Sequence, residues 1–563
     1  MTADSRDLVT RVQAALSAPG APFEAVPGPT GPRYRHGPRT LREFLDSTRA
    51  HGDLTFLVAD GGRLGYAEHH AAATTLARHL LDRYGLRPGD RVAIAMPNLP
   101  AWQTAFWAAQ AAGLVAVPLN AWWTERELSL ALDDCAPGVL VVDAERAGRT
   151  AAWAARHGVP LLTAGVPAGG GPDGAERLED LAALAAGPGE LPAPAPGDDA
   201  TIIYTSGTTG RPKGVTAGHA AWCAALAGAR FFAASSLRCR GVDPAQAPPQ
   251  TALVTFPFFH VAAFTTLLPL MAAGGTAVLM RRWDAPAALA LIAEHRVTTF
   301  SGVPTTALGL LDAADAAGDA MPSLTLLSTG GAPAPPGLSR RVAERFAGRV
   351  EARNGYGLTE TCGGVLAHFG ARYLAEPGSV GRPSPGVEIR IAGPDGSELA
   401  EGAVGELWVR GQAVFRGYRG DAGATAAAFA AEGGWFRTGD LARSRGGEVS
   451  VVDRLKDVVI RGGENVYCGE VEAVLAGHPA VADAAVLGVP HPLLGEEVAA
   501  VVVPRPGAAA DAEELRAHVA GELAAFKVPA HVLVRSEPLP RNPIGKVVKP
   551  VLRQQLAALP PRT

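Results

Sequence analysis

Cysteine is scarce in this chain of 563 residues, which contains five. They are odd in number and scattered along the sequence, at Cys135, Cys223, Cys239, Cys362 and Cys468. Their spacings match no metal-ligand motif, and unpaired cysteines are typical of proteins in a reducing compartment. The sequence therefore predicts a cytoplasmic protein.

The sequence also lacks an excess of one charge and a long uninterrupted apolar run. Its 51 basic and 55 acidic residues give a formal net charge of −4, so a nucleic-acid partner is not expected. Residues 1–8 are polar and acidic, unlike a secretory signal. The stretch 262–280 is broken by Pro269, Gly274 and Gly275, which predicts a buried helix and a strand and no membrane span.

Lysine is rare as well, since only five of the basic residues are lysines. Lysine is a compact point charge on a flexible stem, so a chain that otherwise uses arginine favours it where ammonium chemistry is needed. A surface position needs no such chemistry and is the alternative. Three of the five, Lys213 and Lys546 among them, lie in glycine-rich motifs. These motifs are therefore the first candidates for a functional site.

Two long segments alternate between strand and helix patterns. The first has predicted strands at 91–96, 114–119 and 139–142, with helices at 101–112 and 124–133. Thr124 and Glu127 form a capping box at the start of the second helix. The second segment has predicted strands at 253–256, 276–280, 298–301, 324–328 and 350–354, with helices at 261–273, 285–295, 305–316 and 338–346. Such alternation predicts parallel sheets covered on both faces, with ligands beyond the carboxyl ends of the strands.

The pattern changes after residue 378, and a chain of this length is expected to form two or more domains. Residues 387–391 and 406–410 alternate like antiparallel strands and predict a small antiparallel β-barrel. A smaller α+β unit follows. The predicted fold class is therefore α/β, with two parallel α/β sheets and the barrel in a large domain at 1–455 and a smaller domain at 456–563.

The glycine-rich stretch 204–214 follows a short β-branched run, 200–204, that reads as a strand. It combines small hydroxyl side chains and three glycines with Lys213. Glycine lets backbone N–H groups turn inward and lysine adds a mobile positive charge, as binding of a triphosphate requires. The spacing is not that of a Walker motif. An ordinary surface turn is the alternative, because Gly, Ser and Thr also cluster in turns.

Five motifs occur in an order that resembles the adenylate-forming superfamily, which includes acyl-CoA synthetases, peptide-synthetase adenylation domains and beetle luciferases. The resemblance covers residues 50 to 555, and each motif alone would be weak. The motifs lie at 204–214, 355–361, 437–440, 453–457 and 542–546. In this family a carboxylate attacks the α-phosphorus of ATP, and a thiol then displaces AMP from the acyl-adenylate.

The resemblance assigns roles around ATP, with Glu360 as the Mg²⁺ ligand and Thr359 near the α-phosphate. Mg²⁺ accepts few protein oxygens plus phosphate oxygens, which suits one carboxylate; a carboxylate at a helix N-terminus is the alternative reading of Glu360. The phosphates would be held by Thr205, Ser206, Gly207, Thr208, Thr209, Gly210 and Lys213. The adenosine would be held by Gly331, Ala332, Pro333, Gly355, Tyr356, Gly357, Asp440 and Arg454.

Lys546 is the predicted catalytic lysine, since the matching lysine in the family enters the active site during adenylation. Lys456 matches the hinge about which the smaller domain swings before the thiol step. The segment from Arg461 resembles the form in acyl-CoA synthetases, so Arg461, Gly462 and Gly463 are predicted to bind CoA. Cys468 departs from the family, which commonly has proline there.

The acid is predicted from 256–264, an apolar segment without the aspartate that amino-acid-activating relatives place there. A fatty or other hydrophobic acid fits best and an aryl acid next, with His260 gating or orienting the acyl group or being merely structural. The predicted function is an ATP- and Mg²⁺-dependent acid–CoA ligase. Transfer to a carrier-protein thiol, a degenerate nucleotide-binding scaffold and a luciferase-like oxygenase are the alternatives, and a homodimer is expected only from the resemblance.

Overall fold

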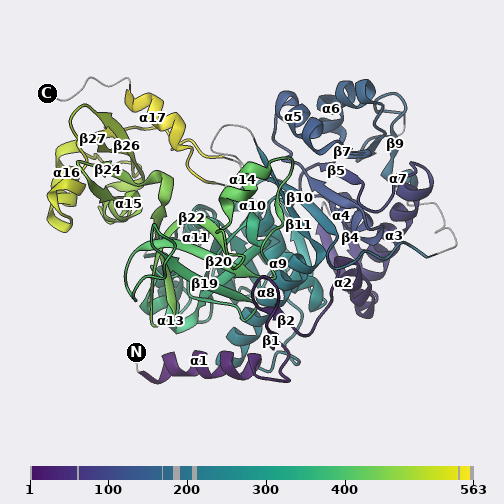
Figure 1. Cartoon of the computed structure of the whole chain (residues 1–563), viewed down its shortest axis with the longest axis horizontal. Coiled ribbons are helices and arrows are strands. Elements are labelled where there is room, and N and C mark those ends of the chain that lie inside the picture. The colour runs from purple at the N-terminus through teal and green to yellow at the C-terminus, as the bar shows by residue number, and fades with distance from the viewer. Residues whose placement is uncertain are drawn as a thin grey trace.

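The computed structural model describes residues 3–59, 62–167, 169–181, 190–205, 212–335, 337–542 and 545–557. It contains two large mixed sheets, a four-stranded antiparallel sheet and a C-terminal sheet of five strands. The C-terminal unit projects from one side of the body in Figure 1, and helix α1 runs along the lower edge of the body. The α/β class and the small C-terminal domain agree with the sequence prediction.

The first large sheet has the order β21-β11-β10-β6-β5-β7-β8-β9. Its strands from β10 to β9 are parallel, and β11 and β21 are added antiparallel at one edge. The strands are β5 Arg91–Ala95, β6 Val115–Pro118, β7 Val139–Asp143, β8 Leu161–Ala164, β9 Glu176–Arg177, β10 Asp199–Thr205, β11 Lys213–Gly218 and β21 Gly417–Tyr418. Helices α3 Tyr66–Asp82 and α4 Pro100–Ala111 pack on one face, and α5 Glu125–Cys135 and α6 Ala144–His157 on the other.

The second large sheet has the order β18-β17-β16-β15-β14-β12-β13-β3-β4, with antiparallel strands at both edges. Its strands are β3 Thr55–Ala59, β4 Gly62–Gly65, β12 Thr251–Val254, β13 Thr276–Leu279, β14 Thr299–Gly302, β15 Leu326–Gly330, β16 Glu351–Leu358, β17 Gly363–Phe369 and β18 Arg382–Pro383. Helices α10 Ala285–Glu294, α11 Pro304–Ala317 and α12 Gly337–Arg345 cover one face. Helix α13 Gly370–Ala375 follows β17.

A shared helical layer joins the two large sheets. Alternate residues of both sheets contribute to one buried core together with α4, α8 His219–Cys239 and α9 Val261–Ala272. Helix α8 is long and apolar enough to cross a membrane by composition, but 67% of its most apolar window is buried in the protein. It is a core helix, and it was not assigned from the sequence. The helix and strand predicted for 262–280 are present as α9 and β13.

The antiparallel unit follows as a four-stranded sheet, β19-β20-β22-β23. In this strand order β19 and β23 are the edge strands, so the sheet is open. The sequence predicted a barrel here. Its elements are β19 Val387–Ala392, β20 Gly405–Gly411, β22 Phe436–Arg445 and β23 Glu448–Arg454, with α14 Ala422–Ala428 beside them. A 3₁₀ turn, η3 Leu455–Asp457, then leads into the C-terminal unit at the predicted hinge.

The C-terminal sheet has the order β25-β24-β27-β26, and β28 pairs with β27. Its elements are β24 Val459–Arg461, β25 Glu464–Val466, α15 Cys468–Ala476, β26 Val481–His491, β27 Gly495–Pro504, α16 Ala512–Glu522, η4 Ala525–Lys527, β28 His531–Val534 and α17 Lys549–Ala557. A core of its own, built on Val498, Ala500 and Val502, supports a separate unit.

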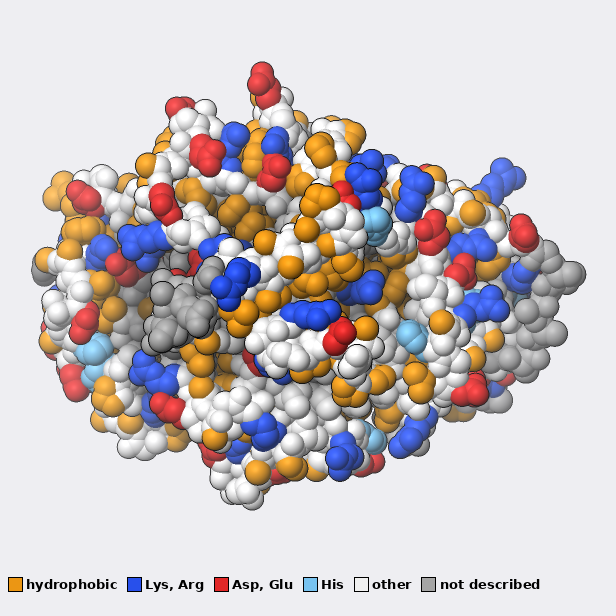
Figure 2. All heavy atoms as spheres, turned by 90° about the horizontal axis from the view of Figure 1, so that it is seen from below, with side chains coloured by type: hydrophobic (Ala, Val, Ile, Leu, Met, Phe, Trp, Pro, Cys, Tyr) orange, Lys and Arg blue, Asp and Glu red, His pale blue; other side chains and the backbone are white. Residues whose placement is uncertain are grey.

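The N-terminal fifty residues are more regular than expected from their Pro and Gly content. Helix α1 Ala3–Ser17 contacts α8 and α13, and Val9 and Leu16 pack on a buried cluster. The other N-terminal elements are β1 Ala25–Val26, β2 Arg33–Tyr34, α2 Leu41–Ser47 and η1 Thr48–His51. Farther along the chain, the short helix α7 Leu178–Leu181 lies between β9 and β10. Acidic and basic side chains are interspersed over the face in Figure 2, which agrees with the small net charge.

Candidate active site

The two large sheets, the four-stranded sheet and a loop of the C-terminal unit contribute side chains or backbone to one cavity of about 1050 Å³. The first sheet provides Thr205 and Lys213, and the second provides the ends of β15 and β16. The antiparallel sheet provides Asp440, and the C-terminal unit provides Lys546. The cavity lies beyond the carboxyl ends of parallel strands, where α/β folds bind ligands. Segments more than 300 residues apart in sequence, such as those of Thr205 and Lys546, therefore meet at one site.

The predicted phosphate loop starts and ends at paired strand residues. Thr205 on β10 and Lys213 on β11 are directly opposite each other in the antiparallel register. The Nζ atom of Lys213 lies 5.0 Å from the ring centroid of Tyr418, a cation–π distance. The intervening site predictions, Ser206, Gly207, Thr208, Thr209 and Gly210, lie outside the described residues. Thr205 and Lys213, at the ends of the two hairpin arms, both line the cavity.

Glu360 is held by the neighbouring tyrosine of the added edge strand. It lies in the 3₁₀ turn η2 Thr359–Thr361, directly after β16. The hydroxyl of Tyr418 donates to its Oε1 atom at 2.9 Å, and the Phe415 N–H donates to its carbonyl at 2.7 Å. Burial raises the pKa of the Glu360 carboxyl, and the Tyr418 hydrogen bond opposes that rise. The carboxylate faces the cavity in a weakly solvated position that favours a nearby cation.

The chain builds no metal cage at this point. Among the described residues, no three His, Cys, Asp or Glu side chains are grouped to hold an ion. Mg²⁺ commonly uses one or two protein carboxylates and completes its shell with water and substrate phosphates. A single buried Glu360 carboxylate beside the phosphate-loop arms fits a metal that is bound mainly by the nucleotide.

Asp440 lies at the centre of a hydrogen-bonded group on the opposite wall. The Tyr356 hydroxyl donates to its Oδ2 atom at 2.7 Å, and the Arg454 Nε lies 3.3 Å from Oδ1. Burial, together with the Asp440 charge, raises the pKa of Tyr356 well above its usual value, so the phenol stays protonated. Asp440 is thus fixed as an acceptor at the cavity wall.

Two of the glycines in the predicted adenine site, Gly357 and Gly331, are at positions that disfavour a side chain. A β-carbon at Gly357 would lie 1.8 Å from the Gly363 carbonyl oxygen. Gly331 has φ 77°, in the left-handed region that favours glycine. Gly331, Gly355, Tyr356 and Gly357 line the cavity, whereas Ala332 and Pro333 are outside its lining.

Lys546 reaches the cavity from the C-terminal unit. Its loop is fixed by hydrogen bonds from the Lys546 N–H to Asn542 Oδ1 at 2.9 Å and from the Asn542 N–H to the Lys546 carbonyl at 2.8 Å. Burial and the positive charge of Arg454 lower the pKa of the Lys546 ammonium to about 8, although Asp440 and Glu360 oppose the decrease. The carboxylates of Glu360 and Asp440 and the ammonium of Lys546 therefore lie at one site.

His260 and Thr359 complete the part of the site where a carboxylate would react. His260 is the N-cap of α9, and its Nδ1 accepts the Ala262 N–H at 3.2 Å. Burial, with a smaller contribution from Lys546, lowers its pKa to about 3, so the ring is neutral at ordinary pH. A neutral ring whose Nδ1 accepts carries its proton on Nε2, so His260 is left with a donor. Both residues line the cavity.

The predicted CoA-binding residues lie elsewhere in this conformation. Arg461, Gly462 and Gly463 form the β24–β25 turn, and none of them lines the cavity. Lys456 does line the cavity, within η3. Cys468 starts α15, is buried, and donates its thiol to the Asp457 carbonyl at 3.1 Å. Burial raises the pKa of this thiol to about 12, so the cysteine packs against the hinge as a small neutral side chain.

Sequence reasoning missed Tyr418 and Thr438, which both line the cavity. Tyr418 positions Glu360, and the Thr438 hydroxyl accepts the Asp440 N–H at 3.1 Å. Thr438 lies inside the recognised motif at 437–440, which was a usable signal. Tyr418 lies on a two-residue strand that pairs with β11, and no periodic pattern marks so short a strand.

The comparisons with known proteins agree with this geometry. A sequence model of the AMP-binding enzyme family matches residues 44–419, and one of the AMP-binding enzyme C-terminal domain matches residues 470–546. A feruloyl-CoA synthase from an Amycolatopsis species is 39% identical over 88% of this chain and 94% of its own length. A long-chain-fatty-acid–CoA ligase from Mycobacterium tuberculosis is 35% identical over 89% of this chain and 94% of its own.

Solved structures show the same architecture. An amide bond synthetase from Marinactinospora thermotolerans has a TM-score of 0.80 and 30% identity, covering 92% of this chain and 100% of its own. The ATP-bound MatB protein from Rhodopseudomonas palustris has a TM-score of 0.79 and 32% identity, covering 91% of this chain and 99% of its own. The likeness extends over both units of the chain.

Proposed function

The chain belongs to the AMP-binding enzyme family, and from that premise we infer that it is an ATP-dependent, AMP-forming acid–CoA ligase for a hydrophobic carboxylic acid. Two of the relatives are named as a feruloyl-CoA synthase and a long-chain-fatty-acid–CoA ligase, and this chain matches each over 94% of its length. The observation that carries the inference is the buried ammonium of Lys546 in the same cavity as Glu360, Asp440 and the phosphate-loop arms. A fatty acid and an aryl acid both remain within this class.

The first step joins two anions, so the site must supply positive charge and hydrogen-bond donors. A carboxylate oxygen of the acid bonds to the α-phosphorus of ATP, and the bond to pyrophosphate breaks. Lys546 would stabilise the charge between the carboxylate and the α-phosphate, and the Thr359 hydroxyl would donate to that phosphate. The neutral His260 would donate its Nε2–H to the acid. Lys213 would neutralise the leaving phosphates.

Glu360 would hold Mg²⁺ together with the phosphates of ATP, and the ion would supply charge neutralisation of the pyrophosphate. Asp440 would accept the ribose hydroxyls, with Arg454 keeping its carboxylate in place. The adenine would lie between Tyr356 and the backbone from Gly331 to Pro333. These assignments rest on the family resemblance and on the positions of the residues at one cavity.

In the second step the thiolate sulfur of CoA bonds to the acyl carbon and AMP leaves with the electron pair of the broken C–O bond. Lys546 occupies the cavity in the conformation described, and Arg461, Gly462 and Gly463 lie away from it. We infer that the unit from Lys456 onward rotates about the hinge, so that Lys546 leaves and the β24–β25 turn approaches. We propose the domain boundary at this hinge, between residues 1–455 and 456–563.

We place the reaction in the cytoplasm, where ATP and CoA are found. Five free cysteines, four of them buried, support a reducing compartment. A homodimer stays a prediction from the family resemblance.

The decisive experiment measures AMP and pyrophosphate release by the purified protein with ATP and Mg²⁺ and a panel of fatty and aryl acids, with and without CoA. We expect acid- and CoA-dependent AMP formation that falls by ~10²–10³ in Lys546→Ala, because one preorganised charge contributes about that factor. The matched control is Lys527→Ala, a lysine that pairs with Glu470 at 2.6 Å in the C-terminal unit and is outside the cavity.

Pyrophosphate release that needs the acid, without any turnover of CoA, would assign the acceptor to a carrier-protein thiol instead. Binding of ATP without turnover of any acid would indicate that the protein is a nucleotide-binding scaffold. Equal losses in Lys546→Ala and Lys527→Ala would contradict the role of Lys546.

A further inference from the structure

The cavity includes a chamber that is lined by helices α8 and α9 and by the second large sheet. The helices give this chamber apolar walls, because α8 presents small and aliphatic or aromatic side chains and α9 presents proline and leucine. The wall residues are Ala229, Phe232, Ala233, Leu237, Pro269, Leu270 and Ala273. A hydrophobic acyl chain fits between these helices.

The sheet that floors the chamber is polar, unlike the helical walls. Ser301, Ser328 and Arg353 are directly opposite one another on the adjacent parallel strands β14, β15 and β16. Residues in register on parallel strands point to the same face, and all three line the cavity. The row is two residues before Gly330 and Gly355, so it lies about 7 Å farther from the adenine site along the strands.

Arg353 has hydrogen-bonding capacity that the described residues leave unused. Its Nη2 donates to Glu351 Oε1 at 3.1 Å. Its Nε is buried and has no hydrogen-bond partner in the described part of the chain. Arg382 Nε and Arg390 Nε are also buried without a partner in the described part of the chain, but neither arginine lines the cavity, whereas Arg353 does. Its free guanidinium N–H is therefore in a position to donate to an acceptor of a bound ligand.

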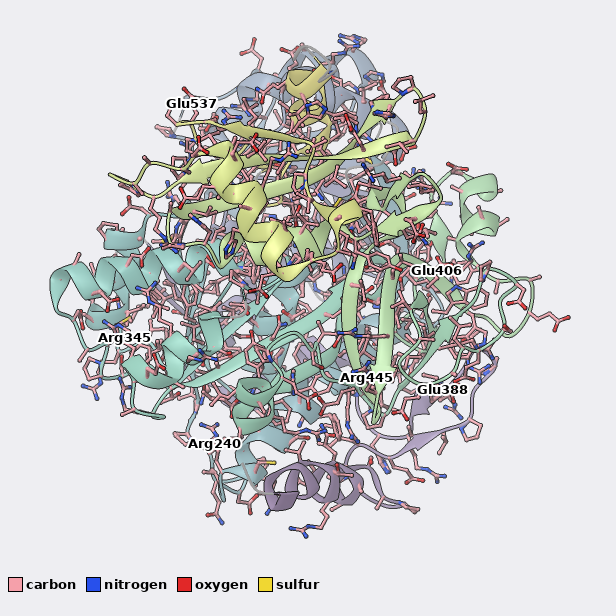
Figure 3. All side chains as sticks on the ribbon, turned by 90° about the vertical axis from the view of Figure 1, so that its left-hand side faces the viewer. Arg240, Arg345, Glu388, Glu406, Arg445 and Glu537 are labelled. Carbon is pink, nitrogen blue, oxygen red and sulfur yellow. The ribbon has the colours of Figure 1, made fainter. Side chains whose placement is uncertain are left out.

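The charges at this end of the chamber do not cancel. Glu351 is shared, because Arg240 Nε lies 3.8 Å from its Oε2 and the Ser236 hydroxyl donates to its Oε1 at 2.8 Å. Arg240 lines the same cavity, and Figure 3 places it near helix α1 at the edge of the molecule. Two arginines and one carboxylate leave a net charge of +1 where a purely hydrophobic tail would end.

We propose that the preferred acid has an apolar middle and a second hydrogen-bond acceptor, a ketone or carboxylate oxygen, at the end remote from the activated carboxylate. Arg353 is the residue that selects this group, with Ser301 and Ser328 beside it. The proposal rests on the proposed ligase function and deepens it. A plain alkyl end would remove water from a charged floor without replacing its hydrogen bonds, which costs free energy.

The test compares three acids with the same number of carbons, namely decanoate, 9-oxodecanoate and decanedioate, using CoA-dependent AMP formation by the wild-type protein. We expect kcat/KM for at least one of the two distally oxygenated acids to exceed that for decanoate by about tenfold or more, the effect of one hydrogen bond to a charged group. The preferred acid identifies the acceptor as a ketone or a carboxylate.

Arg353→Met then inverts the preference, because the apolar side chain accepts an alkyl end and offers no donor. We expect kcat/KM for decanoate to rise and that for the oxygenated acid to fall, each by several-fold. Arg353→Lys retains the charge and part of the preference. The matched control is Arg445→Met, an exposed arginine at the turn between β22 and β23 (Figure 3), which keeps the wild-type ratio.

Equal kcat/KM for the three acids in the wild-type protein, or a preference for decanoate, overturns this proposal and leaves the ligase function intact. A preference that persists unchanged in Arg353→Met also overturns the assignment to Arg353. Absence of CoA-dependent turnover for every acid would instead refute the proposed function itself. The wild-type comparison stands even where a variant fails to fold.

Discussion

The ammonium of Lys546 has a pKa near the pH of an ordinary assay. Burial lowers it to about 8, so at neutral pH the side chain is mostly charged and above pH 8 mostly neutral. The charged form is the one that stabilises the reacting anions. We therefore expect kcat/KM for ATP in pyrophosphate release to decrease with an apparent pKa of about 8 as the pH rises.

Lys546→Arg tests the origin of this decrease. A guanidinium has a pKa above about 12, so it stays charged throughout the range, although its planar shape lowers the absolute rate. The measurement is pyrophosphate release against pH, from neutral to about pH 10, for both proteins. A decrease at the same pH in Lys546→Arg would mean that another group titrates.

At the residue scale, most of the predicted site residues were identified because they lie in recognisable motifs, and Tyr418, which lies in none, was missed. Lys213, Glu360, Asp440 and Lys546 were predicted from five short motifs, and the structure brings them to one cavity. Arg353 lies two residues before the motif at 355–361, and in the sequence nothing distinguishes it from an ordinary strand residue. Its unused donor depends on Glu351 and Arg240, and such three-residue contacts are visible only in the folded chain.

Among the elements, α9 links the architecture to the acid site through its N-cap. His260 accepts the Ala262 N–H and in the same orientation carries its Nε2 proton toward the cavity. His260→Asn preserves a good cap, since Asn is among the preferred N-cap residues, but its amide is shorter than the imidazole. We expect Asn to keep thermal stability while KM for the acid rises by about tenfold, the effect of losing a hydrogen bond to a charged group.

His260→Ala removes both functions, so it should lower the thermal midpoint by about 2 °C relative to His260→Asn, the effect of a lost cap of about 1 kcal/mol. Asp284→Ala is the control, because Asp284 caps α10 by accepting the Ala287 N–H at 2.8 Å and is outside the cavity. It should reduce stability without changing KM. A normal KM in His260→Asn would show that the histidine serves only the helix.

The elements themselves were largely predictable where the sequence is periodic. Both alternating segments appear as parallel strands and helices, and the Thr124–Glu127 capping box is present. The short strands β21 and β18 were not predictable from the sequence. Each has two residues and is recognised as a strand only by its pairing with a neighbouring strand. Helix α1 was missed because its apolar residues Val9 and Leu16 can be recognised as packing positions only when the buried cluster that they contact is known.

On the scale of the whole molecule, Lys546 lies at the site because the C-terminal unit is docked on the larger domain. Gly545, beside Lys546, lies against Val303 at the start of α11: a β-carbon built at Gly545 would be 3.8 Å from the Val303 β-carbon. That separation is the mean for disulfides. The sequence could predict a hinge from the resemblance, but not which surfaces meet, since residues 303 and 545 have no common motif.

A disulfide in the double variant Gly545→Cys with Val303→Cys should therefore hold Lys546 in the cavity. We expect the oxidised protein to form acyl-adenylate and release pyrophosphate in a single turnover, while acyl-CoA formation falls by about tenfold or more and returns on reduction. Comparing oxidised and reduced forms of the same protein cancels the strain of a non-glycine residue at φ 80°. Each single variant and the wild-type protein, with its five free cysteines, receive the same oxidant as controls. If the cross-linked enzyme makes acyl-CoA at its reduced rate, both half-reactions occur in the docked state and rotation about Lys456 is unnecessary.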